Sequence, residues 1–225
     1  MTLDRAEAHH LLHVLRLKVG DSVTLFDGKG GEAAAEIVAM SRSSATVRAG
    51  EVVQRAPQAR LKLTLAVCVP KGKHADMIVE KGTELGMAAF LPVVAQRNVA
   101  DPRAREEGKL AQWRRVATES CKQCGRSDVP AIEPVATFKE VIGRGDFTRR
   151  LLAMMSPEAV PLAEALRECA AGDSVMVVIG PEGGLTEAEE QAAVTAGFVP
   201  VSLGPNRLRV ETAAIAVAAV CALAV

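Results

Sequence analysis

Short apolar runs bounded by glycine, proline or charged residues recur through most of the chain. The run from Val175 to Ile179 is rich in β-branched residues and lies between Gly172-Asp173 and Gly180-Pro181, which predicts a short buried strand. The same pattern predicts further strands over residues 61–69, 88–94, 148–155 and 198–203. Helical segments separate these runs, so residues 60–225 are expected to form an α/β domain with a parallel sheet covered on both faces.

The pattern differs in the first part of the chain. Leu3 to Leu17 has the apolar spacing of a helix, and strands are expected over residues 23–26, 32–38 and 45–53. A turn at Asp27 to Gly31 joins the first two of them. These elements predict a small β-rich domain over residues 1–56, followed by a linker within Gln54 to Arg60.

A glycine-rich loop follows the predicted strand that ends at Ile179. Gly180, Gly183 and Gly184 permit positive φ angles and leave backbone N–H and C=O groups free for a ligand at the carboxyl end of a strand. Thr186 and Glu189 form a capping-box pattern, which predicts a helix directly after the loop. Glutamates in the loop and in the first helical turn disfavour an anion, so either a neutral or cationic ligand or an ordinary glycine turn is expected.

The same design recurs near the carboxyl end. Gly204-Pro205 ends the strand predicted over 198–203, Asn206 to Arg209 form a loop, and a helix begins near Val210. The apolar stretch from Thr212 to Val225 has about 14 residues, fewer than the roughly 20 that span a bilayer. It therefore predicts a buried helix or a subunit interface. Arg209 and Glu211 begin this helix either as a structural ion pair or as functional groups.

Composition narrows the class of protein. The chain has 27 basic and 27 acidic residues, so a nucleic-acid surface must be local. Five scattered cysteines, with neither a signal peptide nor a membrane-spanning run, indicate a reduced cytoplasmic protein that does not bind a membrane. Cys121 and Cys124 form a CxxC without a second pair, and His9 and His13 have no third partner, so no metal site is expected.

Several blocks together carry a family resemblance. GPEGGLTEAE and LGPNRLRVETA, preceded by HHLLHVLRLKVGD, KGKHADMIVEKGTELG and WRRVATESCKQCGRSDVP, resemble the successive blocks of the ribosomal RNA small subunit methyltransferase E family of SPOUT-class enzymes. The resemblance implies methylation of N3 of a uridine in small-subunit (16S) ribosomal RNA, with S-adenosylmethionine as cofactor. It also implies a PUA-like β-barrel domain, a SPOUT parallel-sheet domain with a trefoil knot, and a homodimer. The substrate is either the RNA or the assembled small subunit.

The resemblance assigns roles to individual residues. Arg209, with Glu211, is expected to orient the uracil and stabilise its developing negative charge. Which group removes the N3 proton stays open. The residues expected to bind the cofactor are Gly180, Glu182, Gly183, Leu203, Gly204, Leu208, Arg209, Thr212 and Met154. The residues expected to contact RNA are Arg16, Lys18, Arg97 and Arg126.

Other functions stay open at this point. A SPOUT methyltransferase with another RNA target, such as a ribose hydroxyl, would share both cofactor loops. A non-catalytic RNA-binding relative would need neither loop. A nicotinamide dehydrogenase is disfavoured because no GxGxxG follows an early strand. Family members usually have a segment before the HHLLHVLR block, so the sequence also leaves open whether the β-barrel is complete.

Overall fold

A computed structural model describes residues 1–41, 43–55, 60–98 and 101–224. Contacts within the chain divide it into two compact units, Met1–Pro57 and Gln58–Val225. Most of the predicted linker, residues 56–59, lies outside the described residues. Each unit is described by itself.

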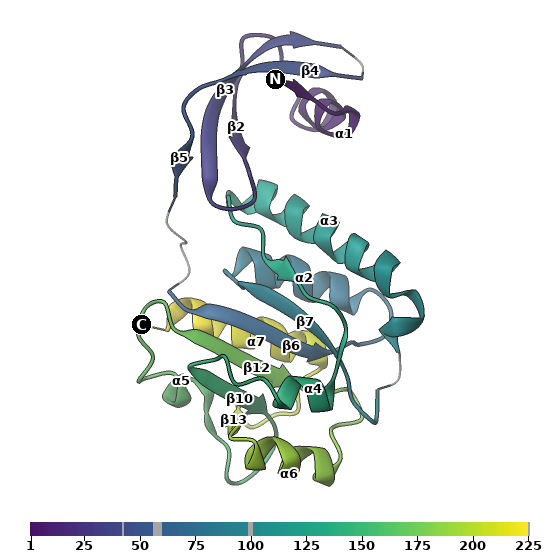
Figure 1. The fold of residues 1–225 in the computed structure, drawn as a ribbon, viewed down its shortest axis with the longest axis vertical. Coiled ribbons are helices and arrows are strands. Elements are labelled where there is room, and N and C mark those ends of the chain that lie inside the picture. The colour runs from purple at the N-terminus through teal and green to yellow at the C-terminus, as the bar shows by residue number, and fades with distance from the viewer. Residues whose placement is uncertain (42, 56–59, 99–100, 225) are drawn as a thin grey trace. The chain divides into compact units, whose positions relative to one another are not determined.

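The first unit is built on an antiparallel sheet (Figure 1). Its strands are β1 (Thr2–Leu3), β2 (Ser22–Phe26), β3 (Gly31–Met40), β4 (Ala45–Ala49) and β5 (Val53–Gln54). They run in the order β1-β4-β3-β2, and β5 pairs with β3. Alternate residues of β3 and β4, among them Ile37 and Val47, pack with Ala8 and Leu11 in a small core. The predicted β-rich domain is therefore confirmed.

Two details of the first unit differ from the prediction. The helix expected over residues 3–17 is shorter and covers α1 (Arg5–His9) and one wider π-helical turn (His10–Val14), because Leu3 belongs to β1 and pairs with β4. A closed barrel would need its two edge strands to pair. Within the described residues β1 and β2 are not paired, so the structure presents an open sheet.

The second unit contains a parallel sheet in the order β11-β13-β10-β12-β6-β7-β8, with β9 paired to β7. Its long strands are β6 (Lys62–Cys68), β7 (Ala89–Val94), β10 (Arg149–Ala153), β12 (Ser174–Ile179) and β13 (Val199–Ser202). Three two-residue strands complete it, β8 (Ala131–Ile132), β9 (Ala136–Thr137) and β11 (Val160–Pro161). All five long strands were predicted, because strands buried on both faces are continuous apolar runs.

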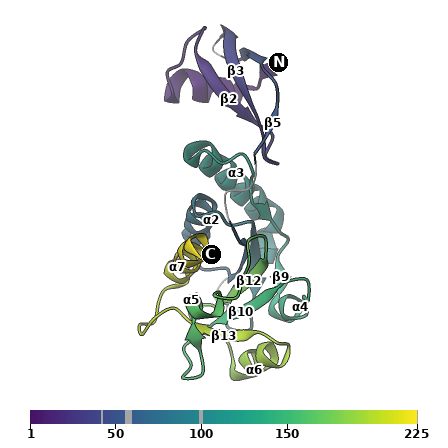
Figure 2. The ribbon, with the colours of Figure 1, turned by 90° about the vertical axis from the view of Figure 1, so that its left-hand side faces the viewer.

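Helices cover both faces of this sheet. They are α2 (His74–Glu84), α3 (Glu106–Cys124), α4 (Phe138–Ile142), α5 (Leu162–Ala165), α6 (Glu187–Thr195) and α7 (Val210–Leu223), with a 3₁₀ turn (Pro102–Arg105) before α3. Leu65 and Val67 of β6 pack in the cluster that includes α2, α3 and α7, whereas Ala66 and Cys68 pack in the cluster with α4 and α6. Figure 2 shows α2 and α7 on one side of the sheet and α4 and α6 on the other.

Because the long strands are parallel, the loops that follow them all lie at the end of the sheet where the strands have their carboxyl ends. The predicted capping box is present, since Thr186 Oγ1 accepts from Glu189 N at 3.2 Å and Glu189 Oε2 accepts from Thr186 N at 2.9 Å. None of the helices in the described part of the chain is long and apolar enough to cross a membrane. The trefoil knot stays a prediction.

Candidate cofactor and RNA site

A cavity of about 580 Å³ lies at the carboxyl edge of the parallel sheet. Three loops form most of its lining, namely residues 153–155 after β10, 179–185 after β12 and 203–210 before α7. Arg97, Glu190 and Ala213 complete the lining. Ligands of open α/β sheets bind at this edge, and the volume falls within the range of roughly 300–1,000 Å³ typical of small-molecule sites.

Glycines shape the wall of this cavity. A Cβ atom at Gly180 would lie 3.2 Å from Leu185 Cγ, which is tighter than ordinary packing allows. Gly184 and Gly204 have φ angles of +71° and +113°, in the region that side chains disfavour. The two loops therefore keep their backbone close to the space that a ligand would occupy.

The turn after β7 holds the glycine-rich loop in place. Arg97 Nη1 donates hydrogen bonds to the carbonyl oxygens of Leu185, at 3.2 Å, and Gly183, at 3.4 Å. Gln96 N donates to Glu189 Oε1 at 2.8 Å, while Glu189 Oε2 caps α6. One carboxylate thus joins the turn after β7 to the first turn of the helix that follows the loop.

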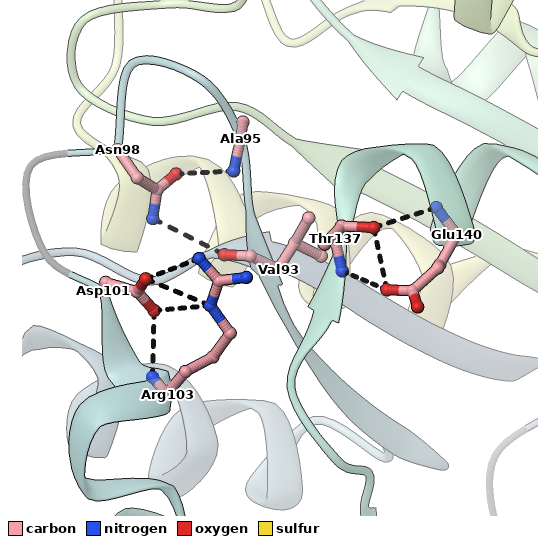
Figure 3. Close-up of polar contacts among 7 residues, drawn as sticks. All are labelled: Val93, Ala95, Asn98, Asp101, Arg103, Thr137 and Glu140. Carbon is pink, nitrogen blue, oxygen red and sulfur yellow. Dashed lines mark hydrogen bonds and ion pairs between the residues drawn. The ribbon is translucent and has the colours of Figure 1, made fainter.

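The turn after β7 is itself fixed by side chains (Figure 3). Ala95 N donates to Asn98 Oδ1 at 3.1 Å, and Asn98 Nδ2 donates to the carbonyl oxygen of Val93 at 3.5 Å. Further along, Asp101 and Arg103 form an ion pair at 2.6 Å. The position from which Gln96 and Arg97 reach the glycine-rich loop is therefore set locally.

Two pKa shifts describe the electrostatics beneath the glycine-rich loop. Burial opposes ionisation of Glu189, but N–H groups of Thr186 and Gln96 and the nearby Arg97 outweigh it and lower the pKa of this carboxyl. Burial, and then the negative charges of Glu189 and Glu182, raise the pKa of the Cys68 thiol to about 12. Cys68 is therefore neutral near pH 7 and is not a nucleophile.

The loop before α7 presents two arginines. Arg207 and Arg209 line the cavity and are exposed, and among the described residues neither guanidinium has a hydrogen-bond or ion-pair partner. Glu211 is engaged elsewhere, since its Oε1 lies 3.2 Å from His74 Nδ1 at the start of α2. Arg209 is thus free to meet a ligand, whereas Glu211 connects the first turns of α7 and α2.

The structure brings most of the predicted cofactor residues together. Gly180, Glu182, Gly183, Leu203, Gly204, Leu208, Arg209 and Met154 all line the cavity. Thr212 is exposed and lies outside this lining, as does Glu211, whose side chain is only 13% exposed. Both follow the loop on the first turn of α7.

The residues predicted to contact RNA are in different environments. Arg16 and Lys18 are exposed on the first unit, and Arg16 has a positive φ of 57°, uncommon for a residue with a side chain. The Arg126 side chain is only 9% exposed and pairs with Asp128 at 2.7 Å. Its Nη1 also donates to the carbonyl oxygens of Thr83 and Met87. This geometry favours a structural role for Arg126 over the expected RNA contact, and Arg97 is likewise engaged by the glycine-rich loop.

Sequence reasoning missed the links that hold the loops. The Gln96–Glu189 contact spans 93 positions, and His74 has no distinguishing pattern around it. Of these links, only the capping box could be predicted from the sequence, because its two residues lie close together in the chain. Within the described part of the chain, no group of three or more histidine, cysteine or acidic side chains could hold a metal ion.

Comparison with protein families defines the class. A model of the RNA methyltransferase domain matches residues 57–222, and a model of the RNA methyltransferase PUA domain matches residues 3–49. The chain therefore combines an RNA methyltransferase domain with a PUA domain, and the glycine-lined cavity lies in the methyltransferase domain.

Individual relatives define the family within this class. The ribosomal RNA small subunit methyltransferase E of Synechocystis is 34% identical over 95% of this chain and 69% of the relative, and that of Bacillus subtilis is 33% identical over 92% and 83%. The chain belongs to the ribosomal RNA small subunit methyltransferase E family.

Solved structures agree with this assignment. The Neisseria gonorrhoeae ribosomal RNA small subunit methyltransferase E, bound to S-adenosylmethionine, superposes with a TM-score of 0.87 at 31% identity over 97% of this chain and 89% of that one. A putative methyltransferase of Legionella pneumophila, in complex with the same cofactor, superposes with a TM-score of 0.89 at 29% identity, over 100% of this chain and 91% of that one.

Proposed function

We propose that the protein transfers a methyl group from S-adenosylmethionine to N3 of a uridine in small-subunit ribosomal RNA. The observation that carries the proposal is the cavity itself, because two glycine loops and Met154 line one space in a chain of this family. Relatives with the same fold have been solved with S-adenosylmethionine bound. A ribosomal RNA substrate supports a cytoplasmic location for this activity.

The residues of the cavity fit this cofactor. Backbone groups of Gly180, Gly183, Leu203, Gly204 and Leu208 would hold its adenosine and methionine portions. Close approach is possible because Gly180 and Gly204 carry no side chain. Glu182 is an exposed carboxylate in the lining and complements a cationic sulfonium better than an anion.

The cofactor supplies an electrophilic methyl group, and the protein positions the nucleophile and stabilises its charge. Uridine N3 carries a proton that must leave before or during attack, so negative charge develops on the uracil ring. Arg209 lines the cavity without an internal partner in the described residues, and its guanidinium would orient the uracil and stabilise this charge. Glu211 would act through its contact with His74, which fixes the start of α7.

Binding of the RNA or of the assembled small subunit would involve both units. Arg16 and Lys18 are exposed cations on the PUA unit, in a position to bind phosphates. We expect a smaller RNA contribution from Arg97 and Arg126, whose guanidinium groups bind backbone carbonyls of the chain.

The exposed side of α7 supports a homodimer. Ile215, Ala216 and Ala219 are only partly covered within one chain, and Leu223 is 87% exposed. Small side chains on a helix let a second backbone approach closely. A second copy on this side would extend the core that α7 already forms with α2 and β6.

Calorimetric titration with S-adenosylmethionine tests the cofactor site. A Gly183→Val variant places a branched side chain where a Cβ would already lie 3.6 Å from Arg97. The unmodified protein should bind saturably and this variant should not, with Gly145→Val as a matched control at a glycine whose Cβ would meet no atom within 4 Å. Equal binding by the Gly183 variant would place the cofactor elsewhere. Absence of binding by every form would favour a non-catalytic RNA-binding relative.

A further inference from the structure

Two lysines lie at the same edge of the sheet as the cavity but outside its lining. Lys71 and Lys73 belong to the turn that follows β6. The last paired residues of β6 and β12 are Val67 and Ile179, so this turn leaves the sheet beside the glycine-rich loop. Both lysines are exposed.

The turn is tied to the loop that carries Arg209. His74 follows Lys73 directly, and its Nδ1 lies 3.2 Å from Oε1 of Glu211, two residues after Arg209. Helices α2 and α7 pack together in one core cluster behind this contact. Lys71 and Lys73 therefore belong to the same surface as Arg207 and Arg209, a surface that we call the cationic rim.

The positive charges of the rim are not neutralised locally. In the part of the chain that the structure describes, the side chains of Lys71, Lys73, Arg207 and Arg209 have neither a hydrogen-bond nor an ion-pair partner. The carboxylates in the first turns of α7 and α2 are engaged elsewhere. Glu211 faces His74, and the carboxylate of Asp76 accepts from Gln112 Nε2 at 2.6 Å and from Trp113 Nε1 at 3.1 Å.

Charges of both signs line the cavity. Its carboxylates are Glu182 and Glu190, and its guanidinium groups are those of Arg97, Arg207 and Arg209. Outside the lining, the turn after β6 adds only positive charge, from Lys71 and Lys73. This excess of positive charge suits a polyanion that approaches the cavity from the lysine side.

We propose that the cationic rim binds backbone phosphates of the RNA next to the target nucleotide, with Lys71 and Lys73 as phosphate contacts. The inference rests on the proposed function and names the surface of that site on which the RNA lies. Lysine ammonium groups act as point charges toward phosphates and read no base. The two lysines should therefore contribute affinity and salt dependence but no choice of nucleotide.

The test compares full-length variants in RNA binding and methyl transfer. Lys71→Ala/Lys73→Ala removes both charges, and Lys71→Arg/Lys73→Arg keeps them. Lys62→Ala is the matched control, since it removes an exposed lysine from the other end of the same strand. Each protein is titrated with S-adenosylmethionine and then assayed with small-subunit ribosomal RNA over a range of salt concentrations.

In the alanine pair, KM for RNA should rise about tenfold and the slope of log affinity against log salt should shrink by roughly 1.4, about 0.7 for each lysine. Cofactor Kd and kcat should stay unchanged. The arginine pair and Lys62→Ala should behave like the unmodified protein. If KM for RNA and the salt slope were unchanged in the alanine pair, the proposal that Lys71 and Lys73 contact RNA phosphates would be wrong. It would also be wrong if the alanine pair lost only affinity for the cofactor. Failure of the unmodified protein to methylate the RNA would instead overturn the proposed function.

Discussion

Gln96 N donates a hydrogen bond to Glu189 Oε1 at 2.8 Å and thereby joins the turn after β7 to the first turn of α6, 93 positions further along the chain. The other oxygen of the same carboxylate accepts from Thr186 N and Oγ1 at the start of α6. Because the glycine-rich loop lies immediately before Thr186, Glu189 holds one end of this loop against the turn after β7. Contacts within the chain therefore fix the position of the loop.

Replacing Glu189 with alanine should loosen this arrangement. The variant loses the capping box and the link to Gln96, so the free energy of unfolding should fall by about 1 to 2 kcal/mol. S-adenosylmethionine should also bind more weakly, because the loop loses its anchor. Urea unfolding and calorimetry measure the two effects. Glu187→Ala, an exposed position on the same helical turn, is the control, and an equal effect of both variants would contradict the role of Glu189.

The lowered pKa of Glu189 predicts that the free energy of unfolding depends on pH. The folded pKa of Glu189 lies below its ordinary value of 4.5. A carboxyl with a lowered pKa contributes stability that is fully present above the unfolded pKa and is lost as pH falls through the folded pKa. Stability should therefore decline below about pH 4.5, and less steeply in Glu189→Gln. If the free energy of unfolding fell equally with pH in the unmodified protein and in Glu189→Gln, this contribution of Glu189 would be contradicted.

Arg126 should matter for stability and not for RNA binding. Its guanidinium is nearly buried against Asp128 and two backbone carbonyls, so Arg126→Ala removes the donor to Asp128 and to the Met87 carbonyl and one of the donors to the Thr83 carbonyl. The free energy of unfolding should fall by about 3 kcal/mol. Arg114→Ala, which removes an exposed arginine from α3, should have little effect. If Arg126→Ala were as stable as the unmodified protein but bound RNA more weakly, the RNA contact predicted from the sequence would be supported instead.

Arg209 should act on the chemical step. Arg209→Ala should lower kcat by about 100-fold to 1,000-fold, because it removes a donor that stabilises developing charge. Cofactor Kd should change little, since backbone groups provide most of that contact, and Arg209→Lys should restore part of kcat. Full methylation by the alanine variant with intact cofactor binding would remove Arg209 from the mechanism.

The sequence predicted those parts of the molecule whose signal is local. The long parallel strands are continuous apolar runs, and the Thr186 capping box is a short motif, so both were readable. The helix expected over residues 3–17 is present over 5–14 and begins later than predicted, because periodicity does not reveal that Leu3 pairs with β4. The two-residue strands β8, β9 and β11 are too short to form a pattern.

In the candidate site, too, the sequence predicted the residues that belong to motifs and did not predict the contacts that depend on the whole fold. Family motifs located the residues of the cavity, including Met154, which is distant from both glycine loops in sequence. They did not reveal that Glu211 faces His74 or that Arg126 is buried, because both facts depend on helices packed by the whole fold. The sequence did not single out Lys71 and Lys73, because their proposed role depends on the loops that the fold brings beside them.

Mapping the methylated nucleotide tests the central claim most directly. Small-subunit ribosomal RNA and assembled small subunits that lack the modification are incubated with the protein and S-adenosylmethionine labelled at the methyl group, and the labelled nucleotide is identified by mass spectrometry. The proposed function predicts one uridine that carries the label on N3, with about 100-fold to 1,000-fold slower transfer by the Arg209→Ala protein. Label on a ribose hydroxyl, or no label on either substrate by a protein that binds the cofactor, would contradict it.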